Sequence, residues 1–279
     1  MTKVEDIFKQ CVQAINGKDF IVREGRADKE YHFQNWFQKR LEALPVDFDI
    51  PGRNSYPDYR LVHDPEGYEL KGLAYPGREA TYDSNSQVPR GEHSGRKIFY
   101  VFGRYPAKPD GNMYPVTDLV LCHGSFLNAD NEYIHRNKSV RGFGSYGDIM
   151  IRDRKMYVAP TPFALAQGTA HHATMILPAD HLVEPSLVEV GVLQRREVDD
   201  LVVAYDFDLR TNELSIKTVP NPNAGRLHDF KAYRVIGDPQ DAVSLRAPAE
   251  ILDDLTATVS TLDDDEETRD GSSTCLHLE

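Results

Sequence analysis

The sequence predicts a mixed α/β protein in which a central β-sheet is flanked by helices, followed by a β-rich C-terminal region. Residues 27–44 carry apolar side chains at helical spacing. Residues 96–105 and 116–126 are rich in β-branched and aromatic residues, which is typical of buried strands. Residues 188–219 alternate between apolar and polar positions, as strands of a half-buried sheet do. Together these features favour one mixed fold over an all-helical or all-β one.

Two helices are expected near the N-terminus. The first spans residues 3–16, with Gly17 as its C-cap. The second spans residues 27–44, with Asp28 as a possible N-cap and Pro45 as its end. Its apolar stripe, which would face the core, consists of Tyr31, Trp36, Phe37, Leu41 and Leu44.

The next elements are a hairpin, a long polar segment and further strands. DYRLV and GYELKGLA flank the turn HDPEG, so two strands are expected between residues 58 and 74. Residues 74–97 read as a long loop, or a loop with a short helix. Residues 147–160 read as a strand, a basic turn and a strand, whereas 128–147 is loop-like. The strand pattern of 188–219 indicates a hairpin region, and 231–237 is a further candidate strand.

We therefore expect a single domain over residues 1–250, with a core at about 27–125 and the β-rich elements at 126–250. Residues 251–279 form an acidic tail. Its run LDDDEETRDGSS is highly charged and lacks aromatic residues, which predicts disorder.

Composition excludes several classes of protein. No run of eighteen apolar residues is present, so no membrane span and no membrane partner are expected. The N-terminal segment is too polar for a signal peptide. Cys11, Cys122 and Cys275 are scattered without CxxC spacing, which predicts a reduced cytoplasmic protein without disulfides or a zinc knuckle. Cys122 reads as a small buried hydrophobe.

The net charge of −12 is unevenly distributed. Residues 21–160 hold 20 Lys and Arg and 19 Asp and Glu, whereas the whole chain holds 32 and 44. The acidic excess therefore lies outside the central segment, and the sign of the charge neither supports nor excludes a DNA partner for that segment.

Three charged residues are expected to converge on the predicted hairpin. Glu69 and Lys71 are two residues apart on one strand, so they share a face. Asp58 begins the partner strand, across the turn, where neighbours on one face lie within side-chain reach. Two convergent carboxylates suit Mg²⁺, and the carbonyl of Leu70 could be a further ligand. A nearby ammonium could stabilise charge on a phosphate or orient a water. These are the elements that phosphodiester hydrolysis needs.

Pro57-Asp58 followed by Glu69-Leu70-Lys71 resembles the PD-(D/E)XK nuclease superfamily, and within it the type II restriction endonucleases. The resemblance implies a restriction-endonuclease-like sheet and Mg²⁺-dependent, sequence-specific cleavage of double-stranded DNA. It implies that Asp58 and Glu69 bind the metal and that Lys71 polarises the water or the phosphate. Many members add an acidic residue from the preceding helix, for which Glu30 is the first match and Glu42 the second.

Two further segments are candidates for contact with DNA. The polar loop containing Asn85, Ser86, Gln87, Arg90 and His93 follows the catalytic strand, and amides suit adenine edges. The basic turn with Arg152, Arg154 and Lys155 could contact phosphates or guanine. Symmetric cutting of a duplex favours a homodimer, and a cognate DNA methyltransferase is expected in the same system.

Other interpretations of these residues remain open. Glu69 and Lys71 could be a surface pair that protects an edge strand, and the Asn and Ser residues could simply build turns. A rival triplet, Asp153-Arg154-Lys155 with Asp148, has odd spacing that would place its carboxylates on opposite faces. His171, His172 and His181 fit no metal motif and read as surface or core residues. The protein could also be another nuclease of the superfamily, acting in repair or on modified DNA, or a non-catalytic DNA-binding protein.

Overall fold

The computed structural model describes the chain from residue 2 to residue 247, except for several short segments and one longer one. The segments outside the description are 24–28, 53–54, 78–79, 86–87, 109–110, 130–145, 147–149, 153–155, 209, 212 and 248–279. Asp28, the rival triplet, Cys275, the acidic tail and most of the expected loop at 128–147 therefore lie outside the described residues.

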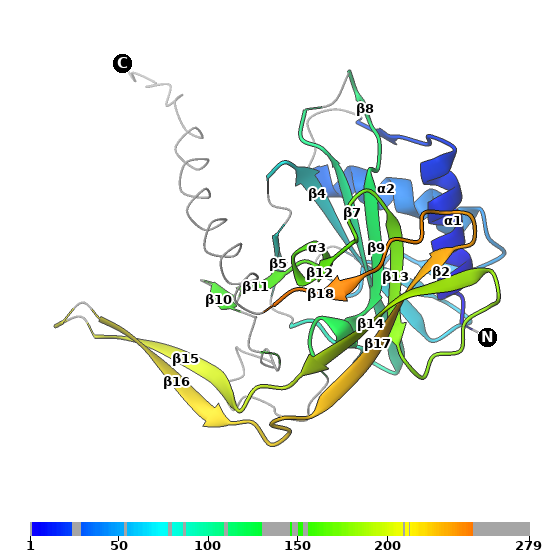
Figure 1. The fold of residues 1–279 in the computed structure, drawn as a ribbon. Coiled ribbons are helices and arrows are strands. Elements are labelled where there is room, and N and C mark those ends of the chain that lie inside the picture. The colour runs from blue at the N-terminus through cyan, green and yellow to red at the C-terminus, as the bar shows by residue number, and fades with distance from the viewer. Residues whose placement is uncertain are drawn as a thin grey trace, which may run out of the picture.

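The fold is mixed α/β and is built on one nine-stranded sheet (Figure 1). Neighbouring strands are parallel at β4/β7 and at β9/β13 and antiparallel elsewhere. β6 (Glu92–His93) lies off the main path and pairs with the start of β7. The strands of the main path, in spatial order, are β14 (Leu187–Arg196), β17 (Leu227–Val235), β13 (Ala173–Pro178), β9 (Asp118–His123), β7 (Arg96–Pro106), β4 (Glu66–Tyr75), β3 (Tyr59–Leu61) and β2 (Phe48–Asp49).

The two long helices pack on one face of this sheet. They are α1 (Val4–Asn16) and α2 (Lys29–Glu42), as the sequence predicts. Trp36 and Phe37 of the expected stripe are buried in a core that also contains Tyr68 and Leu70 of β4. Phe33, which the stripe did not include, is fully buried and lies over Gly103, where an added Cβ would come within 2.2 Å of its ring. Glycine at 103 thus allows α2 to approach the sheet closely.

A second core covers the opposite face. It contains Tyr100 and Phe102 of β7 and Tyr82, whose ring lies 5.0 Å from that of Phe102. Tyr82 belongs to a three-stranded sheet in the order β10 (Met150–Arg152), β11 (Met156–Pro160) and β5 (Thr81–Asn85). Two one-turn helical segments also lie here, η1 (Gly124–Phe126) and α3 (Pro162–Leu165).

Three strand pairs lie outside the two sheets described above. Two are short: β1 (Ile21–Val22) pairs with β8 (Met113–Tyr114), and β12 (Ala166–Gln167) pairs with β18 (Ser244–Leu245). The third consists of β15 (Asp200–Asp208) and β16 (Glu213–Pro220), a ribbon that projects from the end of β14 and β17 (Figure 1). We call this ribbon the arm.

Several expected elements need correction. Residues 74–97 are not simply a loop, because they contain β5 and β6. β5 is the polar segment TYDSN, and its pairing partner β11 lies more than 70 residues away, so local propensity could not reveal it. β13 was not predicted at all, and β17 begins four residues before the expected strand. Gly17 follows α1 as expected, but in the right-handed region, with φ −77°.

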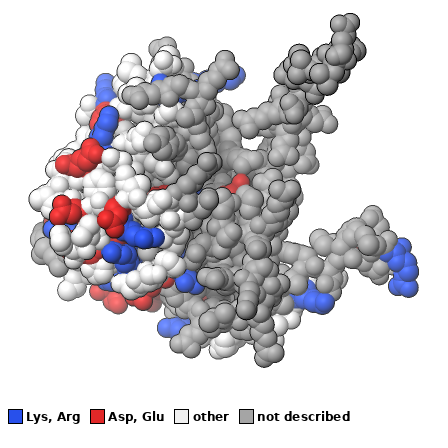
Figure 2. Space-filling model, turned by 180° about the vertical axis from the view of Figure 1, so that it is seen from behind, with Lys and Arg blue, Asp and Glu red and all other residues white. Residues whose placement is uncertain are grey.

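Charge on the rear of the molecule is mixed. Seen from behind, the described Lys, Arg, Asp and Glu side chains alternate over the body rather than gathering by sign (Figure 2). Within the described part of the chain, no helix combines the length and apolarity needed to cross a bilayer.

Candidate functional site

Asp58 immediately precedes strand β3, which begins at Tyr59, and the partner strand β4 extends past this point. The ladder pairs Tyr59 with Tyr68 and Arg60 with Gly67, so Asp58 falls opposite Glu69 in the same register. Asp58 Oδ2 accepts a 2.8 Å hydrogen bond from the backbone N–H of Leu70. The carboxylate therefore takes the place of a strand partner for β4 at this level, which fixes its position against the strand.

Glu69 and Lys71 share the face of β4 that points away from the long helices. Tyr68 and Leu70 are buried on the helix side, so the alternating residues lie on the side of Tyr100 and Phe102. Lys71 Nζ lies 3.0 Å from Glu69 Oε1, and the two side chains are only 14% and 13% exposed. A partly buried ion pair of this kind is held more firmly than one at the surface.

The approach of Asp58 to β4 depends on a glycine. A Cβ added at Gly67 would lie 2.5 Å from Cγ of Pro57 and 3.1 Å from Cδ1 of Ile98. Pro57 itself is buried, and the Tyr56–Pro57 peptide bond is cis. The proline ring thus packs directly on the backbone of β4, and it carries the next residue, Asp58, into register with Glu69.

Three tyrosine side chains lie close together near Glu69. Tyr56 and Tyr100 share a hydrogen bond of 2.9 Å between their hydroxyls, and the ring of Tyr82 lies 6.4 Å from that of Tyr100. Burial raises the pKa of Tyr100 well above its usual value, and the neighbouring Tyr56, Tyr82 and Glu69 raise it further. The hydroxyl therefore stays protonated and can act as a hydrogen-bond donor at any physiological pH.

Positive groups gather near Tyr56. The ring of His93 lies 5.1 Å from that of Tyr56, and the Arg60 guanidinium donates to the Tyr56 carbonyl oxygen at 2.9 Å. The pKa of His93 is lowered, first by burial and then by the charges of Arg90 and Arg60. The imidazole is therefore neutral in a positively charged environment. Of the expected DNA-contacting residues, His93 thus lies beside Tyr56, and Arg90 is close enough to His93 for its charge to lower the pKa of that imidazole.

The two segments expected to contact DNA meet at one end of the small sheet. In the ladder, Arg152 pairs with Met156, and Met156 pairs with Asn85. The backbone positions of Asn85 and Arg152 therefore lie in one row across three strands. Ser86, Gln87, Arg154 and Lys155, which follow them, lie outside the described residues.

Glu30 and Glu42, the two acidic residues on the preceding helix that were expected to join the site, lie at opposite ends of α2. Glu30 is in the first turn of α2, but its side chain is outside the description. Glu42 is exposed at the other end and accepts a 2.7 Å hydrogen bond from Gln38. Because α2 covers the face of Tyr68 and Leu70, Glu42 lies across the sheet from Glu69.

Sequence reasoning missed Arg60, Tyr56 and Tyr100. Arg60 could have been found, because it lies two residues after Asp58 on the same strand and so shares its face. The two tyrosines become neighbours only through the parallel pairing of β4 with β7, which has no local signal.

Asp58 and Glu69 are the residues that could hold a hard divalent cation such as Mg²⁺, because carboxylate oxygens are its preferred protein ligands. Asp58 and Glu69 are opposite in register, and Leu70 directs its N–H toward Asp58, so its carbonyl lies on that side of the strand too. No group of three or more His, Cys, Asp or Glu arranged to hold a metal occurs among the described residues. Two carboxylates are nonetheless enough for Mg²⁺, which commonly keeps several waters and takes further oxygens from a substrate phosphate.

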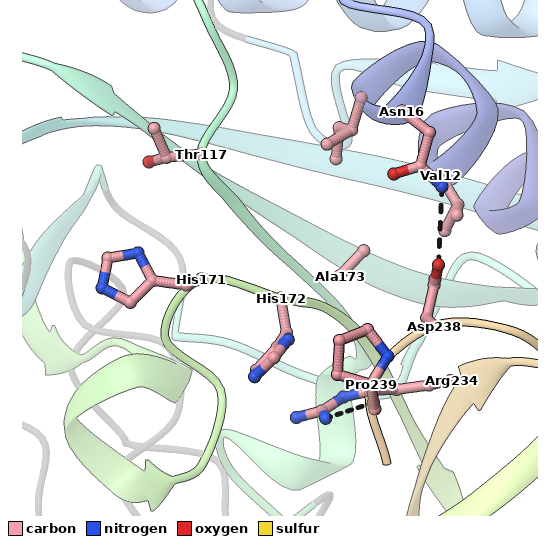
Figure 3. A pocket seen from close by; sticks show the side chains of 10 residues that line it. Val12, Asn16, Thr117, His171, His172, Ala173, Arg234, Asp238 and Pro239 are labelled. Carbon is pink, nitrogen blue, oxygen red and sulfur yellow. Dashed lines mark hydrogen bonds between the residues drawn. The ribbon is translucent and has the colours of Figure 1, made fainter. Parts of the chain in front are cut away.

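A separate pocket of about 80 Å³ lies between the end of α1 and the segment before β13 (Figure 3). Arg234 is fully buried in its wall and donates to the carbonyl oxygens of Pro239, at 2.7 Å, and Gly168. His172 Nε2 lies 3.2 Å from Asp241 Oδ2, whereas the ring of His171 points away from Arg234. The contacts of Arg234 and His172 hold neighbouring loops together, whereas His171 is exposed, as expected for a surface residue.

No protein-family model, curated protein or solved structure matches this chain. The function must therefore be argued from the geometry described above.

Proposed function

We propose that the protein is a metal-dependent deoxyribonuclease of the PD-(D/E)XK type, in which Asp58, Glu69 and Lys71 form the active site. The observation that carries this proposal is the alignment of Asp58 with Glu69 across β3 and β4, with Lys71 3.0 Å from Glu69 on the same face. Together with the mixed sheet and the preceding helix, it favours a restriction-endonuclease-like core.

Asp58 and Glu69 would hold Mg²⁺, with the carbonyl of Leu70 as a further ligand. A bound Mg²⁺ supplies Lewis-acid polarisation of the phosphate and lowers the pKa of water. The backbone N–H of Leu70 orients Asp58 by its 2.8 Å hydrogen bond. Lys71 would turn from Glu69 toward a phosphate oxygen and neutralise charge that develops there. Arg60 and Arg90 supply further positive charge for a polyanionic substrate.

Sequence-specific cutting of duplex DNA is the form of this activity that we favour. The loop after β5 and the β10–β11 turn both start from one row of the small sheet. They would present Asn85, Ser86, Gln87, Arg152, Arg154 and Lys155 to base edges and phosphates. A DNA methyltransferase of the same specificity would protect the host DNA.

Supercoiled plasmid incubated with the protein and Mg²⁺ tests the proposal. Discrete fragments that disappear with EDTA are expected. Nicking or smearing that depends on Mg²⁺ would instead favour a nuclease acting in repair or on modified DNA. A band shift without any cleavage, in Mg²⁺ or Mn²⁺ and on plasmids of several sequences, would contradict the catalytic proposal and support a DNA-binding protein.

A further inference from the structure

A pocket of about 740 Å³ lies at one end of the central strands. β9 and β13 run parallel, and the residues at their carboxyl ends, His123 and Pro178, both line the pocket. Lys97 and Phe99 line it from the beginning of β7, which is antiparallel to β9. In open α/β sheets ligands commonly bind outside the carboxyl ends of parallel strands, and small-molecule pockets measure about 300–1,000 Å³. The place and the size of this pocket therefore suit a small ligand.

The sheet separates this pocket from the proposed active site. Phe99 pairs with Tyr68 of β4 and belongs with it to the core beneath the long helices. Glu69 follows Tyr68 on the same strand, so its side chain lies on the opposite face. A ligand could therefore bind in the pocket without displacing the metal or the phosphate proposed to lie beside Glu69.

His123 supplies a hydrogen-bond donor to the lining of the pocket. Burial lowers the pKa of its imidazole to about 4, so the ring is neutral at physiological pH. Nδ1 accepts a hydrogen bond from the backbone N–H of Ser125 at 3.4 Å and lies 2.6 Å from Ser125 Oγ, so the proton of the neutral ring is on Nε2. The ring packs against Phe99 with the centroids 5.4 Å apart. Nε2–H has no hydrogen-bond partner among the described residues and is available to a ligand.

Two of the carboxylates that line the pocket already have partners within the protein. Glu5 is 4% exposed, accepts a 2.8 Å hydrogen bond from the backbone N–H of Glu184 and lies 3.5 Å from His181 Nε2. Glu184 Oε2 lies 2.7 Å from Lys9 Nζ. These two carboxylates therefore need no further positive charge from a ligand.

Lys97 and Asp180 are not matched in this way. Both are exposed in the lining of the pocket, and neither forms an ion pair with another described residue. Both lie near His123, because the charge of Lys97 lowers the pKa of that imidazole and the charge of Asp180 raises it. Glu92, the ladder partner of Lys97, is also exposed in the lining. A purely anionic ligand would be repelled by the two carboxylates and a purely cationic one by Lys97, whereas a ligand with one charge of each sign would complement both.

We propose that the pocket binds a free α-amino acid with an apolar side chain. Its carboxylate would accept hydrogen bonds from His123 Nε2 and from the Lys97 ammonium, and its own ammonium would face Asp180. The apolar side chain would lie on Leu182 and Val183, which also line the pocket. Leu182 is 92% exposed in the free protein, so covering it would remove apolar surface from water.

Isothermal titration calorimetry on the full chain, without DNA or metal, tests this proposal with three probes that share one aromatic ring. L-Phenylalanine carries both charges, hydrocinnamate lacks the ammonium, and phenethylamine lacks the carboxylate. L-Phenylalanine should bind with a Kd of about 1 mM or below, as expected for a ligand with about a dozen non-hydrogen atoms. Each analogue should bind about tenfold more weakly or worse, because it leaves one charge of the pocket unmatched.

Two substitutions at exposed positions separate the roles of the two charges. Lys97→Met should weaken the binding of L-phenylalanine about tenfold without weakening that of phenethylamine, which has no carboxylate to lose a partner. Asp180→Asn should weaken L-phenylalanine to a similar extent without weakening hydrocinnamate. Lys39→Met and Asp49→Asn, at exposed positions on α2 and β2, are the matched controls and should bind like the wild type. Thermal melts of all these proteins should agree, which would show that each is folded.

Several results would overturn the proposal. A wild-type chain that fails to bind L-phenylalanine up to its solubility limit would do so, as would wild-type affinity in both Lys97→Met and Asp180→Asn. Preference for hydrocinnamate would reveal an anion site and preference for phenethylamine a cation site, and either contradicts a zwitterionic ligand. None of these measurements depends on cleavage, so they can fail or succeed independently of the proposed nuclease activity.

Discussion

Lys71 carries a mostly buried charge on the face of β4 that also bears Glu69. Its ammonium lies on a half-buried face of β4, 3.0 Å from Glu69, where a neutral side chain would avoid the cost of burying charge. A lysine kept there at some cost to stability is consistent with a role in binding or chemistry.

Replacing Lys71 by Met tests that role. The variant keeps an unbranched side chain only one heavy atom shorter and removes the charge that would neutralise the phosphate, so cleavage should fall by at least 100-fold. Lys39→Met, at an exposed position on α2, is the matched control and should cleave like the wild type. Plasmid cleavage rates in Mg²⁺ measure both. Retention of the wild-type rate by Lys71→Met would remove this lysine from the site.

His123 predicts a pH dependence of stability. Burial, followed by the charges of Lys97 and His181, lowers the pKa of its imidazole from 6.5 to about 4, and Nδ1 lies 2.6 Å from Ser125 Oγ. Between pH 6.5 and 4 the unfolded chain binds a proton at this residue and the folded chain does not. Stability therefore falls as the pH drops through this window.

The variant His123→Asn keeps a hydrogen-bonding group near Ser125 but cannot take up the proton. The difference between wild-type and variant unfolding free energies, measured by urea titration, should change by at least 1 kcal/mol between about pH 7 and pH 4. A difference that stays constant over this range would show that His123 titrates normally in the folded protein.

Among the elements, the hairpin of β3 and β4 carries the most functional information. Alternation on β4 and the turn HDPEG were enough to place Glu69 and Lys71 on one face and Asp58 across from them. β5 and β13 were missed for a physical reason. β5 is polar and is held by β11, and β13 is held between β9 and β17, so both owe their conformation to residues distant in sequence. The pairing of Glu69 with Tyr100 on β7 could not be predicted for the same reason.

Gly67→Ala tests whether the close packing of Pro57 on β4 positions the site. The added Cβ would meet Pro57 Cγ at 2.5 Å, so the Pro57-Asp58 segment must move away from Glu69. Stability should fall by about 1–3 kcal/mol, the usual cost of overpacking, and cleavage should fall more than tenfold in protein that is still folded. Gly52→Ala is the control, because nothing lies within 4 Å of the Cβ it would add. Full activity in folded Gly67→Ala would show that the position of Asp58 is not critical.

Arg234→Met tests the fastening of the loops around β17. The change leaves the carbonyl oxygens of Gly168 and Pro239 without their charged donor, so the unfolding free energy should fall by about 2–4 kcal/mol. Arg196→Met, at an exposed position on the adjacent β14, should change it by less than about 0.5 kcal/mol. Equal unfolding free energies for the two variants would show that the hydrogen bonds of Arg234 to these carbonyl oxygens do not stabilise the fold.

At the scale of the whole molecule, the sheet separates two kinds of surface. The long helices α1 and α2 cover one face, and the other face carries Glu69, Lys71 and the small sheet of β5, β10 and β11. The sequence was sufficient to predict the mixed sheet and the two helices, because their patterns are local. The pairing of β15 with β16 was only indicated by the hairpin pattern of residues 188–219, because the register of two strands is not fixed by their local composition.

Diffraction from crystals soaked in Mn²⁺, which can stand in for Mg²⁺ and gives an anomalous signal, tests the central claim most directly. The account predicts a peak about 2.0–2.3 Å from a carboxylate oxygen of Asp58 and another of Glu69, and its loss in crystals of Asp58→Asn. A saturating soak that leaves this position empty, or a peak unchanged in Asp58→Asn, would contradict the proposal that these residues form a metal-dependent active site.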